Sequence, residues 1–146
     1  MKKFTIFVLD DDKPFCDLLS AITEQYFLGV EIEDHEIVLK THYDMENLEE
    51  AIEWVKENKP DLVLLDYMLG YGYDACLGSL DVLRDLLPYC DNIKILTGLW
   101  SEDVRLKLVK EGFVKMDIEV IQKPFNTRKL LQVLKGAIER KKGCLV

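Results

Sequence analysis

A small set of polar residues stands where apolar segments of the chain end, and these residue types could do chemistry together. They are the carboxylates of Asp10, Asp11, Asp12 and Asp66, the hydroxyl of Thr97 and the amine of Lys123. Several carboxylates in one cleft would repel one another unless a cation lay among them, and oxygen ligands of this kind suit magnesium. A hard metal, a lysine and a hydroxyl supply what a phosphoryl group needs, namely charge neutralisation and a hydrogen bond. A carboxylate between them could be the nucleophile that accepts the phosphoryl group.

Short apolar runs of strand length precede these polar residues. They cover residues 3–9, 61–65, 93–96 and 118–121, and a weaker run covers residues 36–41. The four stronger runs are almost entirely apolar, which is typical of parallel strands that are buried on both faces.

Segments with helical spacing of apolar residues alternate with the strand-like runs. They cover residues 14–27, 45–58, 80–87, 102–111 and 126–140. The sequence Asn-Lys-Pro at residues 58–60 predicts the end of the second helix, because proline cannot continue a helix. Small polar residues are predicted to cap the last two helices at Ser101 and Asn126.

This alternation predicts an α/β fold, in which an open parallel sheet has right-handed crossovers and helices on both faces. In such a sheet, ligands bind at the carboxyl ends of the strands. We therefore expect the polar residues that follow the strands to meet at one edge of the sheet.

The size and charge of the chain restrict its domain organisation and its partners. With 146 residues, of which 49% are hydrophobic, we expect a single domain over residues 1–146, with a core over about residues 3–140 and a short tail. A formal net charge of -8 argues against direct binding to nucleic acid. No apolar run has the length of a membrane span, so we expect a cytoplasmic protein without membrane contact. The scattered cysteines are expected to be free thiols: Cys16, Cys76, Cys90 and Cys144.

Four segments, in order along the chain, resemble the motifs of receiver domains of two-component response regulators, the CheY-like family. Residues 8–12 (Val-Leu-Asp-Asp-Asp) resemble the acidic pair after the first strand, and residues 60–66 (Pro-Asp-Leu-Val-Leu-Leu-Asp) resemble the segment that ends in the phosphoacceptor aspartate. Residues 95–98 (Ile-Leu-Thr-Gly) resemble the switch hydroxyl with its small neighbour, and residues 123–125 (Lys-Pro-Phe) the lysine motif. The resemblance covers essentially the whole chain. It implies a flavodoxin-like, five-stranded parallel sheet with strand order 2-1-3-4-5.

The same resemblance implies a Mg²⁺ site. Its protein ligands would be Asp10, Asp11, Asp66 and the backbone carbonyl of Met68. The neighbouring Asp12 is expected to begin the following helix instead, because a negative charge is favoured at a helix N-terminus.

The resemblance also implies a phosphorylation switch rather than an enzyme, with only intrinsic self-phosphorylation and self-dephosphorylation. Asp66 would be the phosphoacceptor, and Thr97 and Lys123 would contact the phosphoryl group. The donor would be a sensor histidine kinase, a phosphotransfer protein or a small phosphodonor. A downstream protein partner would bind through the fourth helix, the fifth strand and the last helix, and a homodimer is compatible with this arrangement. The peptide bond between Lys123 and Pro124 is expected to be cis, as is usual in the family.

Two regions depart from the family pattern. Gly70 stands where the family usually has proline, and the third helix is expected to begin only at residue 80, so the loop over residues 67–78 would be longer than usual. Tyr67 begins this loop beside the proposed site and is a candidate modulator. Val120 stands where many receivers have an aromatic residue, so switching would rely on Thr97 and backbone shifts alone, or on another residue such as Trp100.

Apolar residues are also expected close to the phosphoryl group. Met68 and Leu99 lie two positions after the phosphoacceptor and the switch threonine, and neither can orient a hydrolytic water. We therefore expect slow self-dephosphorylation. Trp100, which follows Leu99, is expected to lie in the core.

Two other functions fit parts of the sequence. A degenerate receiver would be a binding module that does not depend on phosphorylation, although the acidic, hydroxyl and lysine positions are intact. A haloacid-dehalogenase-like phosphatase would use Asp10 and Asp12, but it needs an acidic pair after Lys123, where only Glu139 is acidic. No sequence for an output domain follows Arg140, so we expect either a receiver that acts alone or the receiver part of a longer chain.

Overall fold

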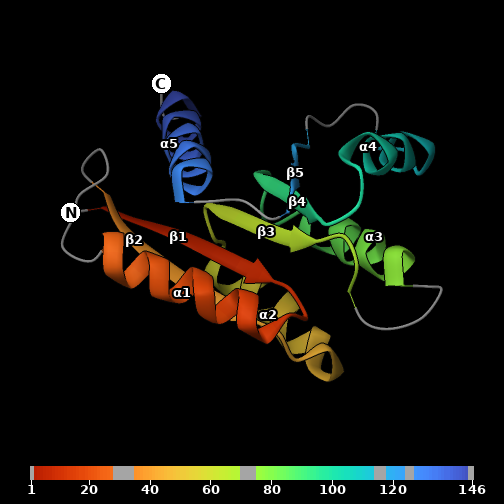
Figure 1. The fold of residues 1–146 in the computed structure, drawn as a ribbon, viewed down its shortest axis with the longest axis horizontal. Coiled ribbons are helices and arrows are strands. Elements are labelled where there is room, and N and C mark those ends of the chain that lie inside the picture. Colours follow the sequence, from red (N-terminus) through yellow and green to blue (C-terminus); the bar gives the residue numbers. More distant parts are fainter. Residues whose placement is uncertain (1, 28–34, 70–74, 114–117, 124–126, 145–146) are drawn as a thin grey trace.

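Strands and helices alternate along the chain and form one parallel sheet with helices around it (Figure 1). The computed structural model describes residues 2–27, 35–69, 75–113, 118–123 and 127–144. The strands are β1 (Lys2–Leu9), β2 (His35–His42), β3 (Leu62–Asp66), β4 (Ile93–Thr97) and β5 (Val120–Gln122). The helices are α1 (Lys13–Phe27), α2 (Leu48–Asn58), α3 (Ala75–Leu86), α4 (Ser101–Lys110) and α5 (Thr127–Cys144), with a short 3-10 helix, η1 (Met45–Asn47), before α2. The strand order is β2-β1-β3-β4-β5, so the predicted fold class is confirmed.

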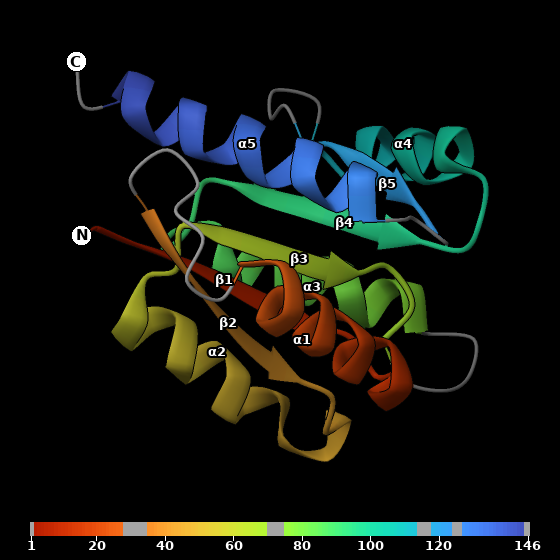
Figure 2. The same ribbon diagram turned by 60° about the vertical axis from the view of Figure 1, so that its left-hand side comes forward.

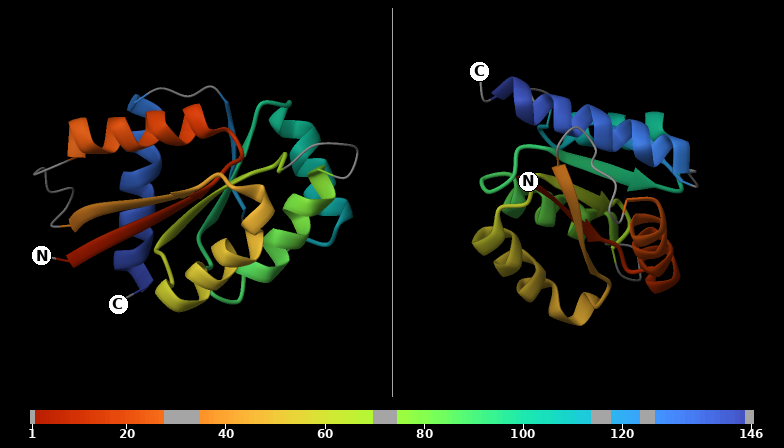
Figure 3. Two further views of the ribbon diagram at one scale, coloured as in Figure 1. Left: turned by 90° about the horizontal axis from the view of Figure 1, so that it is seen from below. Right: turned by 90° about the vertical axis from the view of Figure 1, so that its left-hand side faces the viewer.

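The sheet separates two apolar cores. In β1, Phe4, Ile6 and Val8 pack on one face with residues of α1 and α5, whereas Phe7 and Leu9 pack on the other with residues of α2, α3 and α4. This alternation follows from the period of two residues along a strand. The turned views show the sheet between these helix layers (Figures 2 and 3). Burial on both faces accounts for the nearly continuous apolar runs in the sequence.

The strand boundaries differ from the predicted ones by one or two residues, and at β3 a side-chain hydrogen bond accounts for the difference. Asp61 lies just before β3, and its carboxylate accepts a hydrogen bond from the backbone N–H of Thr5 at 2.8 Å. β3 therefore begins one residue later than predicted and includes Asp66 as its last residue. The weak run at residues 36–41 is a full strand of 8 residues that pairs with β1 along its whole length.

The start of α3 and the N-terminus of α4 were predicted wrongly. α3 begins at Ala75 rather than at residue 80, because a glycine inside a helix, here Gly78, costs only about 1 kcal/mol and does not stop it. Ser101 is the first residue of α4 rather than its cap, and the capping position is Trp100, which makes no side-chain cap hydrogen bond. Trp100 is 78% exposed, so its predicted core position is also wrong. The predicted cap at Asn126 lies outside the described residues.

The predicted free thiols are confirmed for the cysteines whose side chains are described. Cys16 and Cys90 are both buried and unbridged, whereas the side chains of Cys76 and Cys144 and the bond before Pro124 fall outside the description. Within the described part of the chain, none of the helices has the length and apolar character that crossing a bilayer requires.

Candidate functional site

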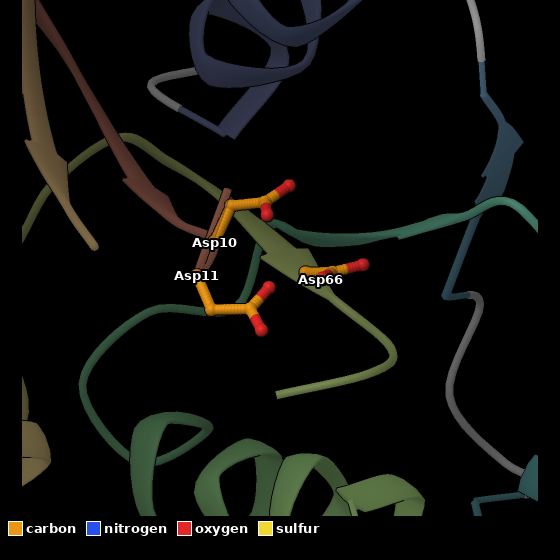
Figure 4. Close-up of side chains that lie close together, drawn as sticks. All are labelled: Asp10, Asp11 and Asp66. Carbon is orange, nitrogen blue, oxygen red and sulfur yellow. The ribbon is translucent and has the colours of Figure 1, made fainter. Parts of the chain in front are cut away.

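Three carboxylates meet where β1 and β3 end (Figure 4). Asp10 and Asp11 follow β1, and Asp66 ends β3, which pairs directly with β1 through Leu9 and Leu65. Each carboxylate offers an oxygen that lies within 4.8 Å of the other two. Asp10 and Asp66 are buried, with 0% and 5% of their surface exposed, and Asp11 is half-buried. The predicted convergence of these aspartates at one edge of the sheet is therefore found.

Backbone groups fix the first turn after β1. The N–H of Asp10 donates to the carbonyl of His42 at 3.2 Å, and a carboxylate oxygen of Asp10 accepts from the N–H of Asp12 at 3.0 Å. The carboxylate of Asp12 in turn accepts from the N–H of Phe15 at 3.2 Å and so caps α1. Asp12 is thus outside the carboxylate cluster, and its predicted place at a helix start is confirmed.

Among the described residues, Lys123 is the only lysine whose ammonium group contacts these buried acids. Its backbone N–H donates to the carbonyl of Thr97 at 2.7 Å, which holds the end of β5 beside β4. Its Nζ lies 2.5 Å from Oδ2 of Asp10 and 3.4 Å from Oδ1 of Asp66. The same Nζ lies over the ring of Phe15, 4.5 Å from the ring centroid, so α1 contributes a cation–π contact.

The charges at this site are unevenly balanced. Burial and then the charge of Asp10 raise the pKa of Asp66 to about 7, although Lys123 and the backbone N–H of Met68 act in the opposite direction. Burial alone would lower the pKa of Lys123, but its hydrogen bond to Asp10 and the charge of Asp66 raise it above its usual value. Lys123 therefore stays charged, while Asp66 is the carboxylate for which ionisation is costly.

The residues at the site fit a hard divalent cation. Three carboxylates that offer oxygens within 4.8 Å of one another carry more negative charge than one lysine neutralises. Burial, and after it the charge of Asp10, raises the pKa of Asp66, and a cation among the carboxylates would act in the opposite direction. Carboxylate oxygens are the ligands that Mg²⁺ prefers in proteins. The donor set of this cluster is consequently compatible with Mg²⁺, as the sequence predicted.

The other residues singled out in the sequence surround the carboxylates in different environments. Thr97 is fully buried at the end of β4, and its hydroxyl oxygen accepts from the backbone N–H of Leu99 at 2.9 Å. Tyr67 and Val120 are buried, whereas Met68 and Leu99 are 39% and 46% exposed. The roles predicted for them, including that of the Met68 carbonyl, stay predictions.

Two residues at the site were not predicted. Phe15 contributes the ring that faces Lys123. Ser79, on α3, is fully buried and donates its hydroxyl hydrogen bond to the backbone carbonyl of Asp66 at 2.8 Å. The amphipathic pattern of α1 could have placed Phe15 on the face toward the sheet, but nothing in the sequence marks Ser79, because its contact depends on how α3 packs.

Comparisons with known proteins agree with this geometry. No protein-family model matches the chain. The chain is 31% identical over 143 residues to the transcriptional regulatory protein YvrH of Bacillus subtilis, covering 96% of this chain and 51% of that protein. It is 29% identical over 136 residues to the phosphate regulon transcriptional regulatory protein PhoB of Pseudomonas aeruginosa, covering 93% of this chain and 52% of that protein. The chain therefore spans about half the length of these curated relatives.

A solved receiver domain shares the fold. The signal receiver domain of a DNA-binding response regulator from Colwellia psychrerythraea superposes with a TM-score of 0.62 at 22% identity, covering 93% of this chain and 98% of that one. Sequence, sheet order and acidic cluster thus agree in supporting a receiver domain of the response regulator class.

Proposed function

We propose that Asp66 is a phosphoacceptor and that its phosphorylation, with Mg²⁺ bound among the carboxylates, switches the affinity of the domain for other proteins. One observation carries the proposal: the carboxylate of Asp66 is buried beside Asp10 and Asp11 and is contacted by the ammonium of Lys123. Because the chain spans about half the length of the curated relatives, the proposal concerns this domain alone.

In the proposed reaction, a carboxylate oxygen of Asp66 attacks phosphorus on a phosphohistidine. The P–N bond breaks while the P–O bond of an acyl phosphate forms. The departing ring nitrogen takes the electron pair of the P–N bond, and the other ring nitrogen keeps its proton, so a neutral imidazole leaves. Lys123, whose Nζ is 3.4 Å from Oδ1 of Asp66, is placed to neutralise a phosphoryl oxygen. Mg²⁺ would supply further charge neutralisation, held by Asp10, Asp11 and Asp66.

Two contacts of Thr97, at the end of the strand beside β3, link elements around the acceptor. The backbone carbonyl of Thr97 accepts from the N–H of Lys123, so the ends of β4 and β5 are linked at the site. The hydroxyl of Thr97, which accepts from Leu99, could instead donate to a phosphoryl oxygen, because a hydroxyl rotates. A phosphoryl group that interacts differently with two arrangements of the segment from Thr97 to Leu99 shifts the populations of these two arrangements. The proposed readers are protein partners at α4, β5 and α5, and the proposed donor is a histidine kinase or a phosphotransfer protein.

Intact-mass measurement after incubation with acetyl phosphate and Mg²⁺ tests the proposal. The native chain should gain the mass of one phosphoryl group, and Asp66→Asn should gain none. Asp12→Asn is the matched control, because asparagine also caps helices and Asp12 is outside the cluster. This control should be phosphorylated like the native chain.

The same experiment separates the two rival functions. Absence of a mass gain on the native chain, with the Mg²⁺ concentration varied, would favour a binding module that does not use phosphorylation. A phosphoryl group found on Asp66→Asn but lost from Asp10→Asn would favour phosphatase-like chemistry at Asp10. Either result would contradict Asp66 as the acceptor.

A further inference from the structure

The outer edge of β2 is the longest unpaired strand edge among the described residues. In the described part of the chain, β2 ends the sheet and pairs with β1 alone, in a continuous register from Lys2 with His35 to Leu9 with His42. The strand has 8 residues, whereas β5 at the opposite edge has 3. In the right-hand view of Figure 3, β2 lies at the end of the sheet between α1 and α2. Edge strands of this length commonly carry a device that prevents pairing with another chain, such as a proline, a bulge or an unmatched lysine.

The backbone of β2 is oriented so that alternate residues face outward. The carbonyl of His42 accepts from the N–H of Asp10 in β1, so His42 points its backbone groups toward β1. Because this direction alternates along a strand, Glu36, Val38 and Lys40 also point toward β1, and the N–H and C=O groups of Ile37 and Leu39 point away from the sheet. The outward backbone groups of Ile37 and Leu39 therefore point to the place that a further strand would occupy.

The side chains of β2 are self-complementary about Val38. In an antiparallel pair of two copies related by a two-fold axis at Val38, Ile37 lies opposite Leu39 and Glu36 lies opposite Lys40, each pair occurring twice. This register joins the outward-facing residues Ile37 and Leu39 in hydrogen-bonded pairs. Moving the axis to Ile37 or to Leu39 would separate Glu36 from Lys40. The charge of Lys40 would disfavour pairing with most other strands. In the proposed pair it lies opposite the carboxylate of Glu36 of a second copy.

Burial is consistent with further contact along this edge. Ile37 and Leu39 pack against the core that includes α1, yet both are only half-buried, and Glu36 and Lys40 are exposed. A second copy would cover the apolar pair on one face of the sheet and would form the two ion pairs on the other, beside Val38. Opposite charges directly across an antiparallel pair are favourable, and like charges there are unfavourable.

We propose that a second copy of this chain docks on β2 in an antiparallel arrangement about Val38, which joins two sheets of five strands into one. The contact involves little more than one strand from each copy, so the dimer is weak, with a Kd on the order of 10⁻⁴ M. It is independent of phosphorylation, because β2 makes the contact and Asp66 does not.

Sedimentation equilibrium over a range of protein concentrations tests this dimer by charge exchange. Glu36→Lys and Lys40→Glu each place like charges opposite each other in both pairs, and each should raise the Kd by at least about tenfold. The double variant Glu36→Lys/Lys40→Glu restores opposite charges and should return the Kd to within a few-fold, roughly, of the native value. Thermal unfolding of each variant checks that it is folded.

Two matched controls make the outcome specific to β2. Leu106→Glu changes an exposed apolar residue on α4 and should leave the Kd unchanged, as should Asp66→Asn. A native chain that stays monomeric at concentrations well above the expected Kd overturns the proposal, as does a dimer that survives both single charge changes. A dimer lost in Leu106→Glu would assign the interface to α4 instead. Failure of this dimer leaves phosphorylation of Asp66 untouched, since intact mass reports phosphorylation on the monomer.

Discussion

Asp66 gives the metal-free protein a pH dependence opposite to that of most aspartates. Its pKa is raised by burial and by Asp10 from 3.8 to about 7 in the folded chain, so between these values the folded state binds more protons than the unfolded state. The free energy of unfolding therefore falls as pH rises from about 4 to about 7, and it is unaffected by this group outside that window. At pH 8, Asp66→Asn should be more stable than the native chain by roughly 2–4 kcal/mol, because the variant buries no charge there.

Urea denaturation of both proteins in EDTA, at several pH values from 5 to 8, measures this difference. Contributions of other titrating groups cancel when the two curves are subtracted, provided that the substitution is the only change. The advantage of Asp66→Asn should shrink toward pH 5, where native Asp66 is largely protonated. An advantage that is constant with pH, or that grows as pH falls, would show that the Asp66 carboxyl is not held at a raised pKa.

The main residues of the site were predictable because they follow strands directly. Asp10, Asp11, Asp66 and Lys123 stand next to apolar runs, and parallel strands bring their carboxyl ends to one edge. Ser79 was not predictable, since its hydrogen bond to the carbonyl of Asp66 depends on the packing of α3 against β3. A contact between a helix side chain and a strand backbone leaves no periodic pattern in the sequence.

At the scale of elements, the end of α2 contains a residue in a conformation that favours glycine. Lys59 has φ 45° and ψ 65°, and its N–H donates to the carbonyl of Val55, which closes the helix before Pro60. A left-handed conformation costs a residue with a Cβ about 1–2 kcal/mol. Lys59→Gly should therefore raise the free energy of unfolding by about 0.5–1 kcal/mol, after the greater freedom of glycine in the unfolded chain is subtracted.

The matched control is Glu57→Gly, two residues earlier in the same helix. Glu57 is exposed and helical, so glycine there should lower the free energy of unfolding by about 1 kcal/mol. Urea denaturation of the two variants should thus give changes of opposite sign. If both substitutions destabilise the chain equally, the backbone at Lys59 is not left-handed in solution.

Elements were predicted well where apolar periodicity determines them and poorly where the chain leaves the sheet. The motif at residues 58–60 correctly predicted the last residue of α2, because proline cannot extend a helix. The third helix was predicted to begin only at residue 80, but α3 begins at Ala75, because packing of the helix outweighs the small cost of Gly78 within it. Trp100 was assigned to the core from its residue type alone, and the turn between β4 and α4 exposes it instead.

At the scale of the whole molecule, the fold itself creates the proposed metal site, so Mg²⁺ should stabilise the folded chain. Asp10 follows β1 and Asp66 ends β3, so the two meet only when β1 and β3 pair. A ligand that binds only the folded state adds RT ln(1 + [L]/Kd) to the free energy of unfolding, which is about 1.4 kcal/mol at ten times the Kd. At pH 8, MgCl₂ should give an increase of this size for the native chain and for Asp12→Asn. It should give little increase for Asp10→Asn.

Ionic strength must be held constant in this comparison, because a chain with a formal net charge of -8 gains stability from any salt that screens its self-repulsion. Proton binding supplies a second, independent signature. Because Asp66 must lose its proton to hold the metal and its pKa is raised to about 7, the stabilisation by Mg²⁺ should decrease as pH falls from 8 to 5. Nonspecific screening would depend much less on the ionisation of Asp66. Equal stabilisation of the native chain and of Asp10→Asn at both pH values would therefore place the effect of Mg²⁺ outside the carboxylate cluster.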